Sequence, residues 1–361
     1  MKHLSVTTAA FLRKQISYLL LSFLCLGTVS CSPDEAWDGF NDLLDEVNKA
    51  KDVPEVITFN RQGLYPEGVS HDALYERFFV SSASTGTVGT VDYKGNYMPF
   101  ITDERLISSI GLEVDENRKR VLIASSDPGN TPNSTPATAG QTAALGIYHL
   151  ATGAPIHYVN LGALRPGIPH FANDIAIDKH GNAYVTDSFS PIIYKVDVHG
   201  NATVFYENEA FATPQGAFGF NGIAYHPAGF LLVAYSINNE IYKIPLSNPG
   251  AISKVALDAP LEGPDGLLLS KNGEQLVVVN NAGGQPSGRV LSFRSANKWQ
   301  TASLAERFDT GPVFPTTATS YGDQVFVLYA HLNKLFGGAP QQQEEFTIRK
   351  VPFSKNELFG R

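Results

Sequence analysis

The sequence has few of the residues that build thiol or redox sites. Among its 361 residues are only two cysteines, two methionines and two tryptophans. Both cysteines, Cys25 and Cys31, lie inside or at the edge of an N-terminal hydrophobic segment, so we expect no disulfide and no thiol chemistry in the folded part. A Gly-x-Ser-x-Gly element is also absent, and no base for Ser81 or Ser82 is visible in the sequence. Serine hydrolase chemistry is therefore disfavoured.

Basic residues are outnumbered by acidic ones. Lys and Arg together number 27 against 35 Asp and Glu, a formal net charge of −8. Loss of residues 1–30 would remove three basic residues and no acidic one, which changes the net charge to −11. We therefore expect no nucleic-acid partner, because binding to nucleic acid relies on clustered Lys and Arg.

Long hydrophobic runs are absent as well. The apolar run at residues 16–26 is too short for a comfortable membrane span. Arg13 and Lys14 precede it, and small residues follow it before Cys31. A short apolar core between basic residues and small residues is typical of an export signal rather than of a folded element.

This N-terminal arrangement resembles a bacterial lipoprotein signal peptide. The resemblance implies a signal peptide at 1–30, an acylated Cys31 and an acidic tether at 31–60 that holds an exported protein on a membrane. Thr28 stands where such signals usually have Leu, and an ordinary secretory signal cut nearby remains the alternative. Within 32–55, apolar residues at helical spacing predict a short amphipathic helix. Either kind of signal implies export.

Turn-forming residues are abundant in the rest of the chain. The sequence has 32 Gly and 22 Pro, with 43% hydrophobic residues, which suggests an all-β protein with many turns. Six segments repeat one pattern: a small or polar residue opens an apolar strand, then come a turn and a second strand that ends near small polar residues. These segments are 66–82, 109–126, 172–188, 220–236, 264–280 and 315–330.

The spacing of these segments predicts their architecture. Their first strand residues are taken as Glu67, Gly111, Asn173, Asn221, Asp265 and about Thr316, which are 44, 62, 48, 44 and 51 residues apart. A period near the roughly 40 to 50 residues of a four-stranded blade fits all intervals but the second, which carries an insertion. We therefore expect a six-bladed β-propeller over 61–352, followed by a C-terminal tail at 353–361.

Four of the repeat positions carry side-chain oxygens. In a propeller the innermost strands line a central channel, so Glu67, Asn173, Asn221 and Asp265 should converge. Two carboxylates and two amide oxygens favour one divalent metal, best Ca²⁺, with Zn²⁺, Mn²⁺ or Mg²⁺ as alternatives. Taken singly, the dipeptides Asn-Asp, Asn-Gly and Asp-Gly are ordinary turn signals. Their shared register favours a metal site.

The same segments resemble a known family. The motifs PEGV (66–69), FANDIAID…GNAYVTDS (171–188), FNGIAYHPAGFLLVAYS (220–236) and GPDGLLLSKNG (263–273) are similar to those of the gluconolactonase, regucalcin and luciferin-regenerating-enzyme family of six-bladed propellers. The resemblance covers roughly 60–352. It implies hydrolysis of lactones or related esters, one metal held by the four residues above, and an Asp265 that helps to activate water.

One departure from the family pattern concerns the substrate. Several sugar lactonases of this family carry Arg two residues before the Asn-Asp pair, where this sequence has Phe171. We expect Phe171 to line the substrate pocket, together with Leu335 and Phe336 from the long 331–345 loop. Apolar lactones or esters would then fit better than a sugar lactone. Core packing between blades is the alternative role for Phe171.

Neighbouring polar residues are expected to have structural roles. Asp174 alternates to the other strand face, where a hydrogen bond between blades or a turn cap suits it better than metal binding. His170 and His331 are read as packing residues near turns, although both could reach the site.

Two functional classes follow. The first is an exported metal-dependent hydrolase with a small lactone or ester substrate. The second is a non-catalytic, Ca²⁺-stabilised propeller that binds a small ligand or a protein partner. A strictosidine-synthase-like site with a Glu base and no metal is disfavoured by the four-oxygen set.

Overall fold

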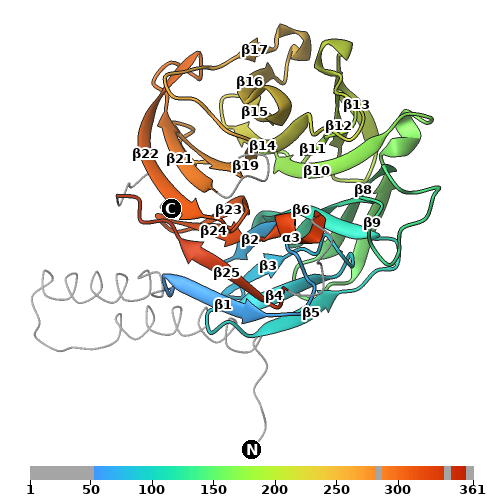
Figure 1. The fold of residues 1–361 in the computed structure, drawn as a ribbon. Coiled ribbons are helices and arrows are strands. Elements are labelled where there is room, and N and C mark those ends of the chain that lie inside the picture. The colour runs from blue at the N-terminus through green and yellow to red at the C-terminus, as the bar shows by residue number, and fades with distance from the viewer. Residues whose placement is uncertain (1–52, 282–286, 337–342, 355–361) are drawn as a thin grey trace, which may run out of the picture. The chain divides into compact units, whose positions relative to one another are not determined.

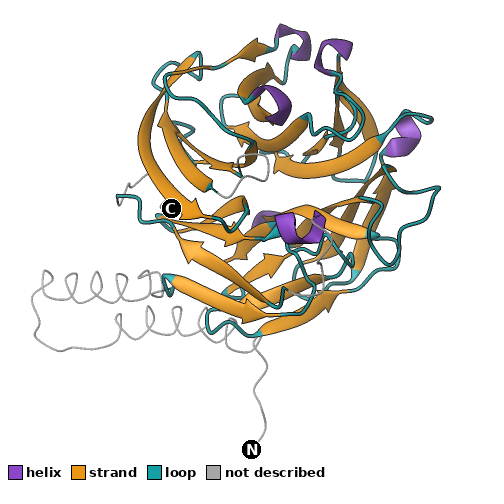
Figure 2. Cartoon of the chain, in the orientation of Figure 1, coloured by secondary structure: helices purple, strands orange, loops and turns teal. Residues whose placement is uncertain are grey.

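The computed structural model describes residues 53–281, 287–336 and 343–354, and strands dominate this part of the chain (Figure 2). The only α-helix in these ranges is the short α3 (Leu332–Phe336). No helix within them is long and apolar enough to cross a membrane. The predicted signal peptide, Cys31 and the predicted tether helix lie outside the described residues.

Antiparallel runs of strands recur along the chain, and the first half contains three of them. The first run is β2 (Val69–Asp72), β3 (Arg77–Val80), β4 (Val88–Asp92) and β5 (Tyr97–Ile101). The second run is β6 (Ser108–Asp115), β7 (Arg120–Ser126), β8 (Gln141–His149) and β9 (Pro155–Asn160). The third run is β10 (His170–Ile177), β11 (Ala183–Asp187), β12 (Ile192–Val196) and β13 (Ala202–Glu207). A short parallel pairing of β8 with β10 joins the second and third runs into one eight-stranded sheet.

The second half continues the pattern. The fourth run is β14 (Phe220–His226), β15 (Phe230–Tyr235), β16 (Glu240–Pro245) and β17 (Ser253–Lys254). The fifth run is β19 (Pro264–Leu269), β20 (Gln275–Asn280), β21 (Gly288–Arg294) and β22 (Thr301–Gly311), with β18 (Ala256–Leu257) parallel to β22. The last sheet is β23 (Pro315–Tyr321), β24 (Gln324–Tyr329), β25 (Glu345–Lys350) and β1 (Val56–Asn60).

Strand β1 closes the last sheet from the other end of the chain. It pairs antiparallel with β25, so that Phe59 lies opposite Phe346, and Ile57 and Phe59 are buried while their neighbours are exposed. These residues fall inside the 31–60 range that the sequence assigned to the tether. That boundary was wrong, because the pairing partner of this short strand lies near the C-terminus and leaves no local signal.

The first strands of the six runs meet in a closed ring. In turn, β2 contacts β6, β6 contacts β10, β10 contacts β14, β14 contacts β19, β19 contacts β23, and β23 contacts β2. Figure 1 shows the sheets arranged around this centre. The predicted all-β, propeller-like arrangement is confirmed.

A shared irregularity shapes the inner strands. Pairing between first and second strands skips two residues at the same place in five sheets, namely after Ser109, Ala172, Phe220, Pro264 and Pro315. Such a bulge re-aims side chains that regular pairing would hold in the sheet. The second skipped residue packs against the next inner strand: a Cβ on Gly222 would lie 2.1 Å from the Asp265 carbonyl oxygen. Glycine is therefore required there.

The bulge also corrects the register of the second repeat. The sequence aligned Gly111 with the ligand positions, but the bulge after Ser109 makes Ile110 their equivalent. Gly111 instead occupies the close-packing position, where an added Cβ would lie 2.4 Å from the Asn173 carbonyl oxygen.

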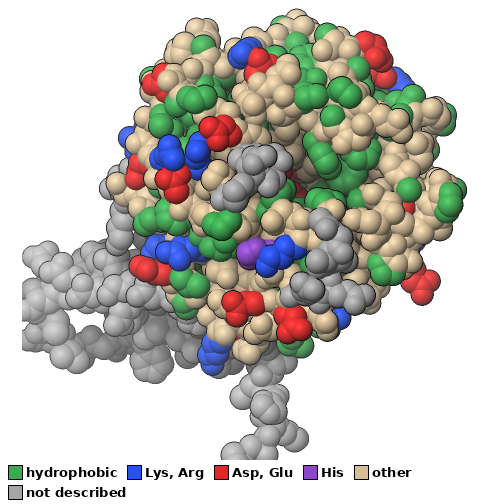
Figure 3. Space-filling model, viewed as in Figure 1, with side chains coloured by type: hydrophobic (Ala, Val, Ile, Leu, Met, Phe, Trp, Pro, Cys, Tyr) green, Lys and Arg blue, Asp and Glu red, His purple; other side chains and the backbone are tan. Residues whose placement is uncertain are grey.

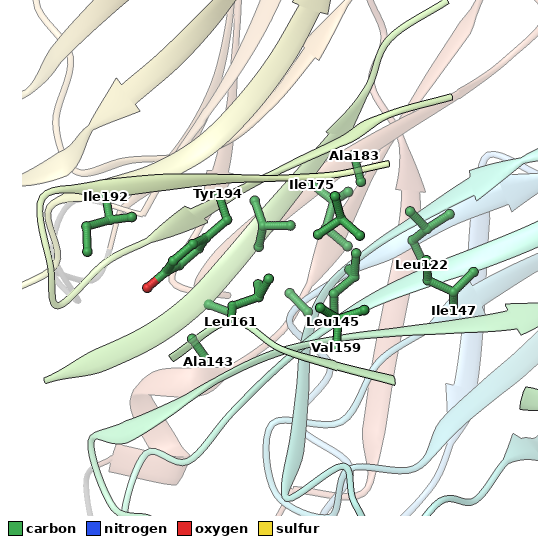
Figure 4. Packing of buried hydrophobic residues seen from close by; sticks show 14 residues of the cluster. Leu122, Ala143, Leu145, Ile147, Val159, Leu161, Ile175, Ala183, Ile192 and Tyr194 are labelled. Atoms are coloured by element: carbon green, nitrogen blue, oxygen red, sulfur yellow. The ribbon is translucent and has the colours of Figure 1, made fainter. Parts of the chain in front are cut away.

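Hydrophobic clusters between neighbouring sheets hold the ring together. Figure 4 shows one of them, in which Leu122, Leu145 and Val159 of the second run pack with Ile175 and Tyr194 of the third. These side chains are almost wholly buried. At roughly 1.5 to 3 kcal/mol for each large buried side chain, such clusters give the inner strands a firm scaffold.

Candidate functional site

A cavity of about 610 Å³ lies over the inner strands, and all four predicted metal ligands line it. Glu67, Asn173, Asn221 and Asp265 are each less than 10% exposed. Figure 3 shows hydrophobic side chains gathered around a hollow on the face where α3 lies. The other lining residues are Ala83, Ile110, Pro128, Phe171, Phe218, Ser236, Ile237, Gly263, Pro264, Asn281, Phe314, Leu332, Asn333 and Phe336.

Hydrogen bonds between its backbone and neighbouring hydroxyl groups fix Glu67 just before β2. Its amide and that of Gly68 both donate to Ser81 Oγ, at 3.1 and 2.7 Å. Its carbonyl oxygen accepts from the hydroxyls of Thr316 (2.6 Å) and Thr317 (3.0 Å) on the neighbouring β23. The side chain of Thr316 therefore holds the backbone of Glu67 in place.

A serine sets the orientation of the Asn173 amide. Asn173 Nδ2 donates to Ser188 Oγ at 2.9 Å, and Ser188 Oγ donates to the Phe220 carbonyl at 2.6 Å. Because the serine gives its only proton to that carbonyl, it must accept from the amide nitrogen. Asn173 Oδ1 is left for the cavity.

Asp265 is held by two amides. Asn281 Nδ2 donates to Asp265 Oδ2 at 2.7 Å, and the Asn221 side chain also hydrogen-bonds to this carboxylate. On the backbone side, Ser236 Oγ donates to the Pro264 carbonyl at 2.5 Å. The carboxylate is therefore fixed from both its own sheet and its neighbour.

Three oxygens of the set lack a donor. Glu67 Oε2, Asn173 Oδ1 and Asn221 Oδ1 are buried and have no hydrogen-bond partner. A buried acceptor without a partner costs about 1 to 3 kcal/mol, and native structures contain few of them. Three such oxygens in one cavity, beside Asp265, fit a hard divalent cation that accepts carboxylate and amide oxygens.

The donor set differs from the usual metal clusters. Across the described ranges, no group of three or more His, Cys, Asp or Glu residues is placed to hold a metal. The candidate site has only two carboxylates and completes its oxygen set with amides. This composition is compatible with Ca²⁺ and gives no nitrogen or sulfur ligand for Zn²⁺.

Burial shifts the acid–base behaviour of both carboxyls. Burial, followed by the charges of Asp265 and Asp174, raises the pKa of Glu67 well above its usual range. Burial, followed by the charge of Asp174, raises the pKa of Asp265 to about 8, against the opposing hydrogen bonds from Asn221 and Asn281. Without a counter-ion the carboxyl groups therefore favour their protonated forms.

Asp174 faces away from the four oxygens. Its Oδ1 accepts from the Ile175 amide (2.8 Å) and its Oδ2 from the Ile223 amide of β14 (3.1 Å). It lines a second cavity with Glu113 and inner-strand residues that follow the bulges. The hydrogen bond between neighbouring sheets agrees with the role expected from the sequence.

Two of the three predicted pocket residues line the cavity, and the third does not. Phe171 lines the cavity, with ring centroids 4.9 Å from Phe189 and 5.3 Å from Phe218, and Phe336 lines it while 53% exposed. Leu335 is buried and is not a lining residue; Leu332 takes that place. Leu332 and Phe336 are four residues apart in α3 and so lie on the same helix face, whereas the sequence predicted a loop in this segment.

None of the histidines that the structure describes lines the cavity. His170 is hydrogen-bonded through Nδ1 to Asp187 (2.7 Å) and through Nε2 to the Arg165 carbonyl (2.8 Å), which makes it a packing residue. His331 lies just before α3 outside the lining. Asn281 and Phe218 line the cavity but were missed. Asn281 directly follows the apolar strand β20, the only sequence signal that could have found it.

Comparisons with known proteins agree with the fold. No protein-family model and no curated protein match the chain. Among solved structures, the major allergen Mala s 1 of Malassezia sympodialis has a TM-score of 0.64 at 18% identity, covering 82% of this chain and 96% of that one. A luciferin-regenerating enzyme gives 0.58 at 13%, with 84% and 98% coverage. A calcium-binding protein, regucalcin, from Agrobacterium tumefaciens gives 0.53 at 17%, with 83% and 95%. At these identities the likeness shows a shared fold.

Proposed function

We propose that this protein is a six-bladed β-propeller hydrolase of lactones or related esters that depends on one divalent metal ion, with Ca²⁺ the best fit. Each antiparallel run is one blade, and β1 completes the sixth. The observation that carries the proposal is the set of three partnerless oxygens beside Asp265 in one open cavity. The regucalcin and luciferin-regenerating-enzyme folds support it as analogy.

The four side chains Glu67, Asn173, Asn221 and Asp265 would hold the ion. A bound divalent ion would supply Lewis acidity for a substrate carbonyl. Its charge would balance the two carboxylates, which then stay ionised at neutral pH. This explains how carboxyls with raised pKa values remain available as bases.

Asp265 is the candidate general base. In its ionised form it would take a proton from the water that attacks the carbonyl carbon, and it would return this proton to the alkoxide oxygen that departs when the acyl C–O bond of the lactone or ester breaks. Asn281 restrains the carboxylate by donating to Oδ2, so rotation of the group is limited during this transfer. The apolar residues around the cavity would limit the access of bulk water once substrate is bound, which would strengthen the interactions among the polar groups.

A lactone and ester panel tests the proposal. Purified full-length protein should hydrolyse at least one member with Ca²⁺ present and lose this activity in a chelator. Asp265→Asn keeps the size and an oxygen but removes the base, so kcat should fall by about 10² or more. The exposed Asp309→Asn, on β22, is the matched control and should retain activity.

The alternative is a non-catalytic propeller that uses the ion for stability and binds a small ligand or protein in the same cavity. A protein that binds the ion but hydrolyses nothing in the panel would favour this alternative.

Export with a lipid anchor on Cys31 is part of the proposal. Its support is the N-terminal sequence pattern, which would place the enzyme on a membrane surface.

A further inference from the structure

The cavity lining carries no positive side chain among its described residues. No Lys, Arg or His belongs to it, and its only charged members are Glu67 and Asp265. The charge of one divalent ion is balanced by these two carboxylates. No remaining group would compensate a carboxylate or phosphate on a substrate, and burying such a charge without a partner is costly.

Three polar side chains of the lining donate to other protein atoms, and the partnerless oxygens of Glu67, Asn173 and Asn221 are those assigned to the ion; Asn333 of α3 is exposed. Asn173 donates to Ser188, Asn281 donates to Asp265, and Ser236 donates to the Pro264 carbonyl. A polyhydroxylated substrate would leave its hydration shell and find few donors and acceptors to replace it. Each unreplaced hydrogen bond costs about 1 to 3 kcal/mol.

Apolar residues make up most of the rest of the lining. Phe171 and Phe218 form an aromatic wall, in contact with Phe189 behind them at 4.9 and 5.4 Å between centroids. Leu332 and Phe336 of α3 belong to the same lining.

Phe314 adds a strained aromatic residue to this lining. Its φ is +49°, a conformation that non-glycine residues adopt rarely and at a free-energy cost. The surrounding structure holds it there, since the Ala330 amide donates to the Phe314 carbonyl at 3.2 Å. An aromatic ring is therefore kept in the cavity despite backbone strain.

We propose that the site selects an uncharged lactone or ester whose carbonyl is its main polar recognition point and whose apolar substituent packs against Phe171, Phe218 and α3. Phe218 is assigned as a specificity-determining residue, since it lines the cavity and is only half-buried. The kinetic test of this inference rests on the proposed hydrolase function. The binding test does not require hydrolysis.

The kinetic test uses δ-lactones with alkyl chains of increasing length, gluconolactone, and a δ-lactone that carries a carboxylate. In the full-length protein with Ca²⁺, kcat/KM should rise about two- to fourfold per methylene until the cavity is filled. Gluconolactone and the carboxylated lactone should be the poorest substrates. Equal or better turnover of either one, or no dependence on chain length, overturns the inference.

Matched phenylalanine variants locate the effect. Phe218→Ser should reduce the ratio of kcat/KM for the long-chain and unsubstituted lactones by about tenfold. Phe205→Ser is the control, because Phe205 is also half-buried and contacts Tyr184 outside the cavity. An equal loss of the ratio in both variants contradicts the role of Phe218.

A binding test separates this inference from the hydrolase proposal. Alkyl-substituted δ-lactams cannot be hydrolysed readily but share the carbonyl and chain, so with Ca²⁺ present they should raise the melting temperature more as the chain lengthens. Gluconolactam should not. If this trend appears without hydrolysis of any lactone, the hydrolase proposal fails and the apolar selectivity stands. Absence of the trend refutes the selectivity whatever the activity.

Discussion

Removal of the proposed metal ion should make the protein sensitive to pH through the carboxyl group of Asp265. In the metal-free fold, burial and the charge of Asp174 raise the pKa of this group to about 8, from 3.8 for an unperturbed Asp. The folded state then holds a proton that the unfolded state releases. Stability is therefore lost as the pH rises from about 4 to about 8, and the loss levels off above the folded pKa.

The size of this effect follows from the two pKa values. At 1.36 kcal/mol per pKa unit, the proton held at pH 7 corresponds to a loss on the order of 4 kcal/mol relative to acidic pH. At about 2 °C per kcal/mol for a domain of this size, the metal-free melting temperature should fall by roughly 8 °C. Glu67 adds to the loss in the same direction, because its pKa is also raised.

Thermal melts in chelator between pH 5 and pH 8 give the assay. Asp265→Asn cannot ionise at this position, so its metal-free melting temperature should fall less than that of the parent over this range, and added Ca²⁺ should stabilise it less than the parent. Glu113→Gln is the matched control, because burial raises the pKa of Glu113 to about 8 in the second cavity. This variant should also flatten the pH dependence of the melting temperature, but it should keep the full stabilisation by Ca²⁺. A parent that melts at the same temperature from pH 5 to pH 8 in chelator refutes the reasoning.

Three further changes test other parts of the account. Gly222→Ala should destabilise the fold by about 2 kcal/mol or more and weaken metal binding, because the new Cβ would lie 2.1 Å from the Asp265 carbonyl oxygen; equal melting curves and equal Ca²⁺ affinity would contradict this. Asn173→Leu removes a partnerless buried oxygen together with the donor to Ser188 Oγ, and it should lower Ca²⁺ affinity at least tenfold; unchanged affinity in a calcium titration would exclude Asn173 as a ligand. Cys31→Ser should convert a membrane-associated protein into a soluble exported one on cell fractionation, and equal association of both forms would place the anchor elsewhere.

The repeat and its polar positions could be predicted from the sequence because they depend on local signals. A period near 40 to 50 residues and turn dipeptides at the strand starts are enough to align Glu67, Asn173, Asn221 and Asp265. The structure places these four side chains in one cavity. Once the strand register of the repeats is assigned correctly, the propeller-like architecture brings these four side chains together.

The remaining features depend on contacts that are distant in sequence. The two-residue bulge makes Ile110, not Gly111, equivalent to the predicted ligands, and a bulge shifts register without a distinctive residue at its centre. Strand β1 is specified by its pairing with β25 at the other end of the chain. Leu332 lines the cavity in place of Leu335 because the segment forms one short helical turn. Phe218 lines it because its ring packs against Phe171.

Calcium titration of the metal-stripped protein tests the central claim most directly. Calorimetry should give about one Ca²⁺ per chain, with release of protons at pH 7 because ion binding ionises Asp265 and Glu67. Glu67→Gln and Asp265→Asn should each weaken binding, whereas Glu113→Gln should not. Absence of saturable binding, or binding of equal strength in all three variants, would contradict a metal site at the four oxygens.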